Sequence, residues 1–131
     1  MRRLFLASLA ALPLLAACTA PEVKSPAARV VFFNQDDATL DDPAKAVIAE
    51  AAEVAKRHLS TTVRVAGFSD PQPTPVAGGN TGLSSLRARA VADQLRADGV
   101  APARIILQPR GATTYESVPV ESRRVEINIS N

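Results

Sequence analysis

The sequence of 131 residues contains one cysteine, one histidine, one tyrosine and no tryptophan. A single cysteine excludes both an intramolecular disulfide framework and a zinc site built from several cysteines. The scarcity of histidine and aromatic residues argues against a haem protein, a multi-histidine metal site and an aromatic surface that stacks nucleic-acid bases. We therefore predict no metal ion, no cofactor and no nucleic-acid partner.

The net charge of the chain is also small. The 15 Lys and Arg residues and the 13 Asp and Glu residues give a net charge of +2. The surplus is accounted for by Arg2 and Arg3, because no acidic residue occurs in the first 17 positions and residues 18–131 carry 13 charges of each sign. The later part of the chain is therefore neutral, and a basic surface for nucleic acid is not predicted.

The amino terminus has the pattern of an export signal. Arg2 and Arg3 precede an apolar run from Leu4 to Ala17. At ~1.5 Å per residue, this run would span only about 21 Å as a helix, which is less than the ~30 Å hydrocarbon core of a bilayer. We therefore expect residues 1–17 to form a signal peptide rather than a membrane span.

Cys18 follows this run directly. The stretch Leu15-Ala16-Ala17-Cys18 resembles the lipobox of bacterial lipoproteins, in which the cysteine is acylated, with palmitate for example, and becomes the first mature residue. Because Thr19 and not aspartate comes next, the resemblance implies an anchor in the outer membrane, facing the periplasm. Without acylation, Cys18 would be a free thiol or a small buried apolar residue. We expect residues 18–28, with two prolines and little to bury, to form a short tether.

Residues 29–131 are expected to form one domain of alternating strands and helices. Four runs of β-branched, aromatic or alternating residues are the expected strands: 29–33, 62–68, 105–107 and 125–129. Two runs with helical periodicity are the expected helices: 44–59, after a cap at Asp41-Asp42-Pro43, and a second from Ser84 or Ser85 to Ala97, ended by Gly99. Three prolines and three glycines indicate a loop over residues 69–82.

The order βαβαββ indicates how these elements pack. It predicts an α/β domain of the two-layer α+β kind, with both helices on one face of a four-stranded mixed sheet. The helix between the first two strands predicts a right-handed crossover and parallel pairing of these strands.

Four segments together resemble the OmpA-like peptidoglycan-binding domain, over Val30 to Ile129. They are Phe33–Leu40, Gly67–Asp70, Asn80–Ala88 and Ser122–Ile127. A lipobox followed by such a domain is also the layout of the peptidoglycan-associated lipoprotein family. The resemblance implies a non-catalytic lipoprotein that binds meso-diaminopimelate in the stem peptide of peptidoglycan and tethers the outer membrane to the cell wall.

The resemblance also implies a binding pair. The free end of meso-diaminopimelate carries an ammonium and a carboxylate, so its site needs an acid and a base at a fixed separation. Asp70 and Arg87 match the family positions that supply them, with Arg87 expected in the first turn of the second helix, beside free backbone N–H groups at Ser84–Leu86. Taken singly, Asp70 is equally suited to a turn and Arg87 to a solvated helix surface.

Three more residues match family positions around this pair. Asp36 matches an acidic position beside the site, Asn80 would hold the loop or touch the ligand, and Arg124 would order the acidic groups. The ordinary alternatives are turn formation for Asp36 and Asn80, and an outward strand charge for Arg124.

The sequence departs from the family pattern in ways that leave a second function open. The segment between Asp70 and Leu83 is two residues longer than is common, Ser122 replaces the usual asparagine, and residues 112–116 lack the usual glycine and glutamate. The alternative function is an interaction module that binds another envelope protein. We do not predict an enzyme, because His58 is the sole candidate for the histidine of a hydrolytic triad.

Overall fold

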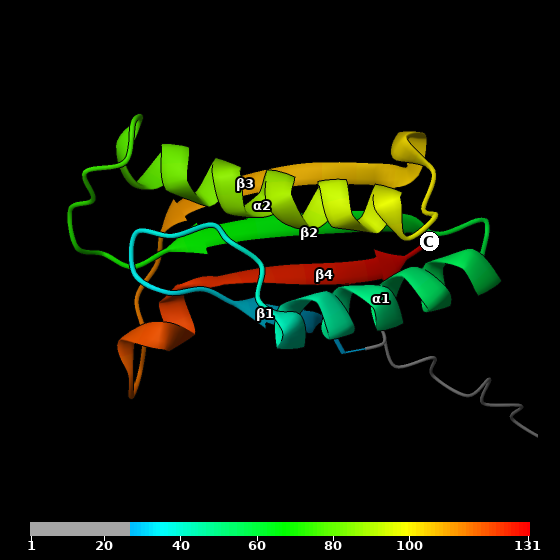
Figure 1. Cartoon of the computed structure of the whole chain (residues 1–131), viewed down its shortest axis with the longest axis horizontal. Helices are drawn as coiled ribbons and strands as arrows, with labels where there is room; N and C mark the ends of the chain where they lie inside the picture. The colour runs from blue at the N-terminus through cyan, green and yellow to red at the C-terminus, as the bar shows by residue number, and fades with distance from the viewer. Residues whose placement is uncertain (1–26) are drawn as a thin grey trace, which may run out of the picture.

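The computed structural model describes residues 27–131 as two helices covering one face of a four-stranded sheet (Figure 1). The elements in chain order are β1 (Arg29–Phe32), α1 (Asp42–Arg57), β2 (Thr62–Ser69), α2 (Gly79–Ala97), η1 (Pro102–Arg104), β3 (Ile105–Ala112), η2 (Pro119–Ser122) and β4 (Arg124–Ser130), where η1 and η2 are short 3-10 helices. The predicted fold class is confirmed. The predicted signal peptide and Cys18 lie outside the described residues.

The strand order is β1-β4-β2-β3. β4 is antiparallel to both β1 and β2, and β2 is parallel to β3. The predicted pairing of the first two strands is therefore wrong: they run in the same direction, but β4 lies between them. Periodicity identifies strands and not their order, and here the crossover through α1 steps over one position in the sheet.

The core lies between the sheet and the helices. In β4, the alternating Val125, Ile127 and Ile129 are buried under the helices, as its sequence pattern predicts. β3 continues five residues beyond its predicted end, through Pro109, which an edge strand tolerates because its free side needs no hydrogen-bond donor.

α1 starts as predicted and ends earlier. The Asp41 carboxylate caps it by accepting a hydrogen bond from the Ala44 N–H at 2.8 Å. The helix stops at Arg57, and Leu59 beyond it is 77% exposed. At this end Nη2 of Arg104 donates to the carbonyl oxygens of Ala55 and His58, each of which also accepts a main-chain hydrogen bond.

α2 begins at Gly79, five residues before the predicted start, so part of the predicted loop is helical. Gly78 takes a left-handed φ of 83°, and the Gly82 N–H donates to its carbonyl to form the first turn. The N–H groups of Ser84–Leu86 are thus engaged within the helix, and Arg87 lies in the third turn. The expectation of free N–H groups beside Arg87 is therefore wrong.

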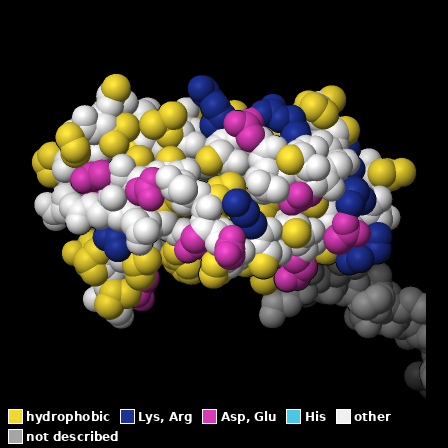
Figure 2. All heavy atoms as spheres, viewed as in Figure 1, with side chains coloured by type: hydrophobic (Ala, Val, Ile, Leu, Met, Phe, Trp, Pro, Cys, Tyr) yellow, Lys and Arg dark blue, Asp and Glu magenta, His cyan; other side chains and the backbone are white. Residues whose placement is uncertain are grey.

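The other end of α2 is as predicted. The helix ends at Ala97, Gly99 has a left-handed φ of 102°, and the Val100 N–H returns to the Leu95 carbonyl at 3.0 Å. Within residues 27–131, neither helix combines the length and apolarity needed to cross a membrane. Acidic and basic side chains intermingle on the helical face in Figure 2, in keeping with the balanced charge of residues 18–131.

Candidate functional site

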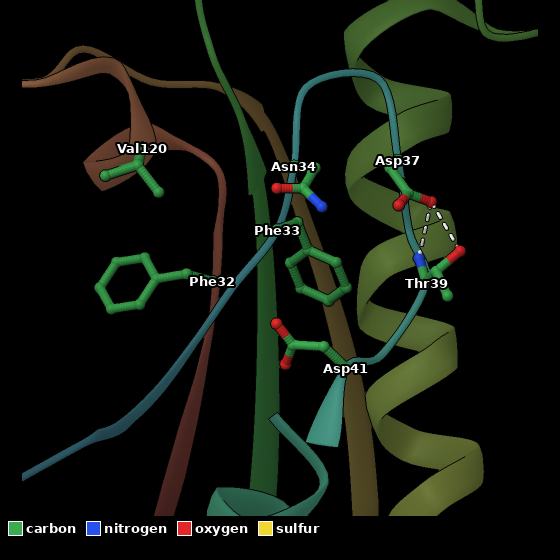
Figure 3. Close-up of a pocket in the computed structure, with 7 residues that line it drawn as sticks. All are labelled: Phe32, Phe33, Asn34, Asp37, Thr39, Asp41 and Val120. Atoms are coloured by element: carbon green, nitrogen blue, oxygen red, sulfur yellow. Dashed lines mark hydrogen bonds between the residues drawn. The ribbon is translucent and has the colours of Figure 1, made fainter. Parts of the chain in front are cut away.

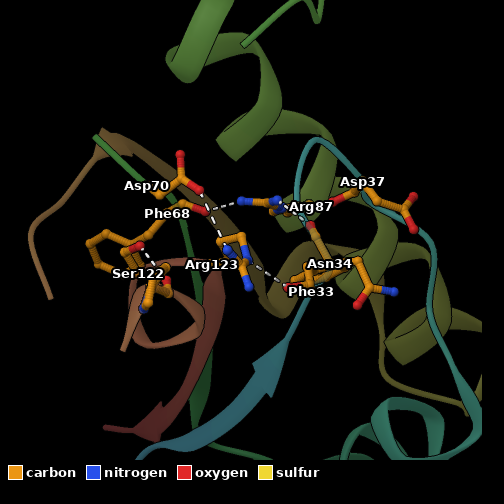
Figure 4. A network of polar contacts seen from close by, with 9 residues as sticks. Phe33, Asn34, Asp37, Phe68, Asp70, Arg87, Ser122 and Arg123 are labelled. Carbon is orange, nitrogen blue, oxygen red and sulfur yellow. Dashed lines mark hydrogen bonds and ion pairs between the residues drawn. The ribbon is translucent and has the colours of Figure 1, made fainter. Parts of the chain in front are cut away.

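Three segments that are distant in the sequence meet at one end of the sheet, on the left in Figure 1. They are the loop after β1, the end of β2 with Asp70, and the residue before β4, Arg123. A backbone hydrogen bond from the Phe33 N–H to the Arg123 carbonyl at 2.8 Å joins two of them. Main-chain carbonyls from the loop after β1 and from the end of β2 face the side chain of Arg87 on α2, and the side chains of Asp70 and Arg123 lie beside it (Figure 4).

Arg87 is completely buried, at 0% exposure. Its Nε donates to the Asp37 carbonyl at 2.8 Å, Nη1 to the Phe68 carbonyl at 3.0 Å and Nη2 to the Asn34 carbonyl at 2.9 Å. Its guanidinium carbon also lies 5.4 Å from the centre of the Phe33 ring. Arg87 therefore lies beneath the site and ties the loop after β1 to the end of β2, and the alternative of a solvated helix surface is wrong for it.

A buried cation needs compensating negative charge. Burial lowers the pKa of the Arg87 guanidinium, and the negative charge of Asp70 opposes this effect. The negative charges of Asp36 and Asp37 also raise the pKa of Arg87, whereas the positive charge of Arg123 lowers it, as burial does. Arginine remains charged in proteins, so these carboxylates form the counter-charge of a permanent buried cation.

Asp70 itself is almost buried, at 8% exposure. Its Oδ2 forms a long ion pair with Nη1 of Arg123, at 3.7 Å. Among residues 27–131 its carboxylate accepts no hydrogen bond, so it keeps its acceptor capacity for a donor from outside the chain.

Arg123 is the residue at this site that sequence reasoning missed. Its Nε donates to the Phe33 carbonyl at 3.2 Å, and its side chain is 18% exposed next to Asp70. The predicted Arg124 points to the opposite side of the sheet, where its guanidinium carbon lies 4.4 Å from the centre of the Phe68 ring and its Nε donates to Glu126 at 2.9 Å. The alternation of β4 would have distinguished the two, because the residue two before the buried Val125 shares its side.

Asp36 and Asn80, the other two predicted residues, lie at the edge of the candidate site. Asp36 is exposed and has a positive φ of 51°, in a turn closed by the Asp37 N–H on the Asn34 carbonyl. Asn80 is partly buried in the first turn of α2, where its carbonyl accepts a hydrogen bond from Ser69 Oγ at 3.3 Å. Turn formation is thus observed for Asp36, whose charge also acts on Arg87. Of the predicted set, Asp70 and Arg87 lie at the centre of the site.

A separate cavity of about 310 Å³ lies beside the loop after β1 (Figure 3). Its lining consists of Phe32, Phe33, Asn34, Asp37, Thr39, Asp41 and Val120. The Asp37 carboxylate accepts hydrogen bonds from Thr39 Oγ1 at 2.7 Å and Thr39 N–H at 2.9 Å, which lower its pKa. Across residues 27–131, no three potential ligands are grouped so that they could hold a metal ion.

Comparison with known families matches residues 32–123 to the OmpA family. The chain belongs to this family. An outer membrane protein of Gluconacetobacter diazotrophicus is 33% identical over 111 residues, which is 75% of this chain but only 29% of that protein's length. The predicted resemblance to the OmpA-like domain is confirmed.

Two solved structures show the same fold. The peptidoglycan-associated lipoprotein of Burkholderia pseudomallei is 24% identical, with a TM-score of 0.68, covering 78% of this chain and 90% of that one. The periplasmic domain of Helicobacter pylori MotB is 19% identical, with a TM-score of 0.69, covering 82% and 79%.

Proposed function

We propose that this OmpA-family protein is an outer-membrane lipoprotein that binds peptidoglycan non-covalently and tethers the membrane to the cell wall. The observation that carries the proposal is the pair formed by Asp70 and Arg123, an acid and a base held 3.7 Å apart above the buried Arg87. The fold shared with a peptidoglycan-associated lipoprotein supports the proposal.

The proposed ligand is the free end of meso-diaminopimelate in the stem peptide. Its ammonium would donate to the Asp70 carboxylate, and the arginines at this end of the sheet would supply positive charge for its carboxylate. Asn80 and Asp36 border the site and would shape its rim. Arg124 faces the other side of the sheet and is not part of the proposed site.

The affinity of one site should be modest. Charge-assisted hydrogen bonds contribute about 1.5–3 kcal/mol each, and two or three of them must overcome an association cost of at least about 4 kcal/mol. Anchoring through a lipid on Cys18 would compensate for the weak binding of a single site, because many copies on one membrane would face a polymeric ligand at high effective concentration. The tether proposed for residues 18–28 would keep the domain close to that membrane.

The test is sedimentation of the mature chain, purified in detergent, with purified cell-wall sacculi. We expect the wild type to pellet with the sacculi and free meso-diaminopimelate to reduce the pelleted fraction. Asp70→Asn should stay largely in the supernatant. Asp93→Asn is the matched control, because Asp93 is an exposed carboxylate on α2 that pairs with Arg96. A wild type that remains in the supernatant would contradict the proposal.

A second candidate function is the binding of another envelope protein. It is favoured by the exposed side chains of Pro71, Pro73 and Pro75, which directly follow Asp70. Prolines already restrict the backbone of this segment, so it would lose little conformational entropy when it docks on a partner. This function would gain support if the wild type failed to sediment with sacculi yet retained a specific envelope protein.

A further inference from the structure

The turn after α1 carries basic residues and an exposed leucine, at the end of the domain away from the candidate site. We propose that this tip, residues 56–60, contacts the anionic phospholipid surface of the membrane in which the chain is anchored. The inference rests on the lipid anchor at Cys18 that forms part of the proposed function. It gives the folded domain a membrane contact of its own, which would direct the candidate site away from the membrane.

The tip lies at the same end of the sheet as the start of β1. On one side of β4, Arg29 of β1 is opposite Ile127. On its other side, Thr62 of β2 is opposite Ser130. The start of β1 and the turn from α1 into β2 therefore both lie near the carboxyl end of β4, on the right in Figure 1. The candidate site lies at the other end, where β1 and β2 finish.

The short connection to the anchor keeps the tip near the membrane. Residues 18–28 are 11 residues, which span at most about 40 Å when fully extended. The anchor therefore holds this end of the domain at a high effective concentration relative to the membrane surface. A contact that would be too weak to form from solution can then form within the anchored molecule.

The side chains of the tip suit an anionic interface. Leu59 is 77% exposed. Arg57 and His58 directly before it are also exposed, and within residues 27–131 Arg57 forms no ion pair. Lys56 adds a second positive charge, although it pairs with Glu53. Basic side chains are attracted to anionic head groups, and a leucine beside them can enter the boundary of the acyl chains.

Arg104 holds the tip in a fixed shape. Its Nη2 donates to the His58 carbonyl at 2.8 Å and to Thr61 Oγ1 at 3.0 Å, and its Nε donates to the Thr61 carbonyl at 3.0 Å. The Thr61 N–H closes the turn on the His58 carbonyl at 3.1 Å. Leu59 is therefore presented outward by a turn that is already ordered, so little conformational entropy would be lost on contact with a membrane.

The opposite end of the domain shows that exposure alone does not select a membrane contact. Val118 is also exposed, at 49%, but it lies among acidic residues. The Glu121 carboxylate accepts hydrogen bonds from the N–H groups of Glu116 and Val118. An anionic surface would repel these carboxylates, so the distribution of charge favours the tip as the end that meets the membrane.

Tryptophan fluorescence can test the contact, because the chain contains no tryptophan. Leu59→Trp places a single fluorophore in the tip, and Val118→Trp is the matched control with the same ring at the other end of the domain. The full mature lipidated chain is reconstituted in vesicles of phosphatidylcholine and phosphatidylglycerol, with or without brominated acyl chains. Bromine quenches only a fluorophore that reaches the hydrocarbon.

We expect the emission of Leu59→Trp to shift to shorter wavelength and to fall by about half in brominated vesicles, whereas Val118→Trp should lose less than about a tenth. Vesicles of phosphatidylcholine alone should quench Leu59→Trp less, because each basic residue near an anionic surface strengthens binding by roughly fivefold. Arg57→Glu, combined with Leu59→Trp, should lower the quenching to the level seen in phosphatidylcholine alone. Arg89→Glu, combined with Leu59→Trp, makes the same charge change at an exposed position of α2 and should leave the quenching unchanged.

Flotation of the same vesicles measures the anchor separately. A wild type that does not float with the vesicles would refute the lipid anchor of the proposed function and this inference together. If the wild type floats, quenching of Leu59→Trp no greater than that of Val118→Trp would overturn only the inference. Equal quenching in the two lipid compositions, or quenching insensitive to Arg57→Glu, would also overturn it. Sedimentation with sacculi tests the wall-binding part of the proposed function independently.

Discussion

Gly67 of β2 lies directly against Ser84 of α2: a Cβ atom on Gly67 would be 2.2 Å from the Ser84 carbonyl oxygen. The same atom would be 3.0 Å from Cβ of Ala88. The absence of a side chain at Gly67 thus sets how closely α2 approaches the sheet. It also sets the depth of Arg87, which lies on the same part of α2 and reaches the Phe68 carbonyl.

Gly67→Ala should therefore destabilise the domain. The added methyl group would meet main-chain atoms that cannot move without shifting α2, so we expect a loss of about 3 kcal/mol in the free energy of unfolding. Urea denaturation measures it. Gly79→Ala serves as the control, because no atom lies within 4 Å of its added Cβ and only its left-handed φ of 65° costs energy, roughly 1 kcal/mol. Equal losses for the two variants would contradict the steric argument.

Arg104→Ala should lower stability without affecting ligand binding. Its guanidinium donates to the carbonyl oxygens of Ala55, His58 and Thr61, at the end of the sheet opposite the candidate site. Removing it deletes these charge-assisted hydrogen bonds, although the Ala55 and His58 carbonyls keep the His58 and Thr61 N–H groups as donors. We expect a loss of about 2–3 kcal/mol in the free energy of unfolding. Arg104→Lys should recover only part of it, because one ammonium cannot reach several carbonyls.

The readouts for Arg104 are urea denaturation and sedimentation with sacculi, both at a temperature where the variants stay folded. Weakened sedimentation of folded Arg104→Ala would mean that the two ends of the sheet are coupled.

Acid should destabilise the loop after β1 through Asp37. Hydrogen bonds from Thr39 lower the pKa of Asp37 from its usual value of 3.8. Because the folded-state pKa is the lower one, Asp37 stabilises the fold above its usual pKa, and this contribution disappears as the pH falls through the folded value. The melting temperature should thus fall below about pH 4, and Asp37→Asn should reduce the steepness of that fall. An identical pH profile for the variant would exclude this contribution.

Acylation of Cys18 predicts the mass of the mature protein. Mass spectrometry of the membrane-extracted protein should give residues 18–131 plus the mass of the attached lipid, and Cys18→Ser should lack both this addition and membrane retention. A mature protein with an unmodified Cys18 would disprove the anchor and leave the binding proposal for the domain intact.

Local patterns in the sequence predicted the local features of this fold. The Asp41 cap, Gly99 at the end of α2 and the alternation of β4 each depend on a few neighbouring residues, so they could be recognised without tertiary information. The insertion of β4 between β1 and β2 could not, because strand order depends on contacts between distant residues. The start of α2 was missed because glycines normally disfavour helices, whereas Gly82 here packs against the Ala77 carbonyl.

The candidate site was predictable in part for the same reason. Asp70 is predictable because it follows a recognisable strand, and Arg87 because its motif matches the family. The burial of Arg87 depends on carbonyls from two other segments, which no local pattern reveals. The alternation of β4 is sufficient to place Arg123, and not Arg124, on the side of the sheet where the site lies.

The central position of β4 also bears on how the protein folds. β4, one of the two inner strands, is the last strand of the chain, so β1 and β2 cannot be joined until the end of the chain arrives. Such long-range pairing slows folding. The candidate site also forms only after β4 has paired with β1, because Arg123 precedes β4 and contacts the carbonyl of Phe33. A partly folded chain would therefore lack the contact between Arg123 and the Phe33 carbonyl on which the proposed site depends.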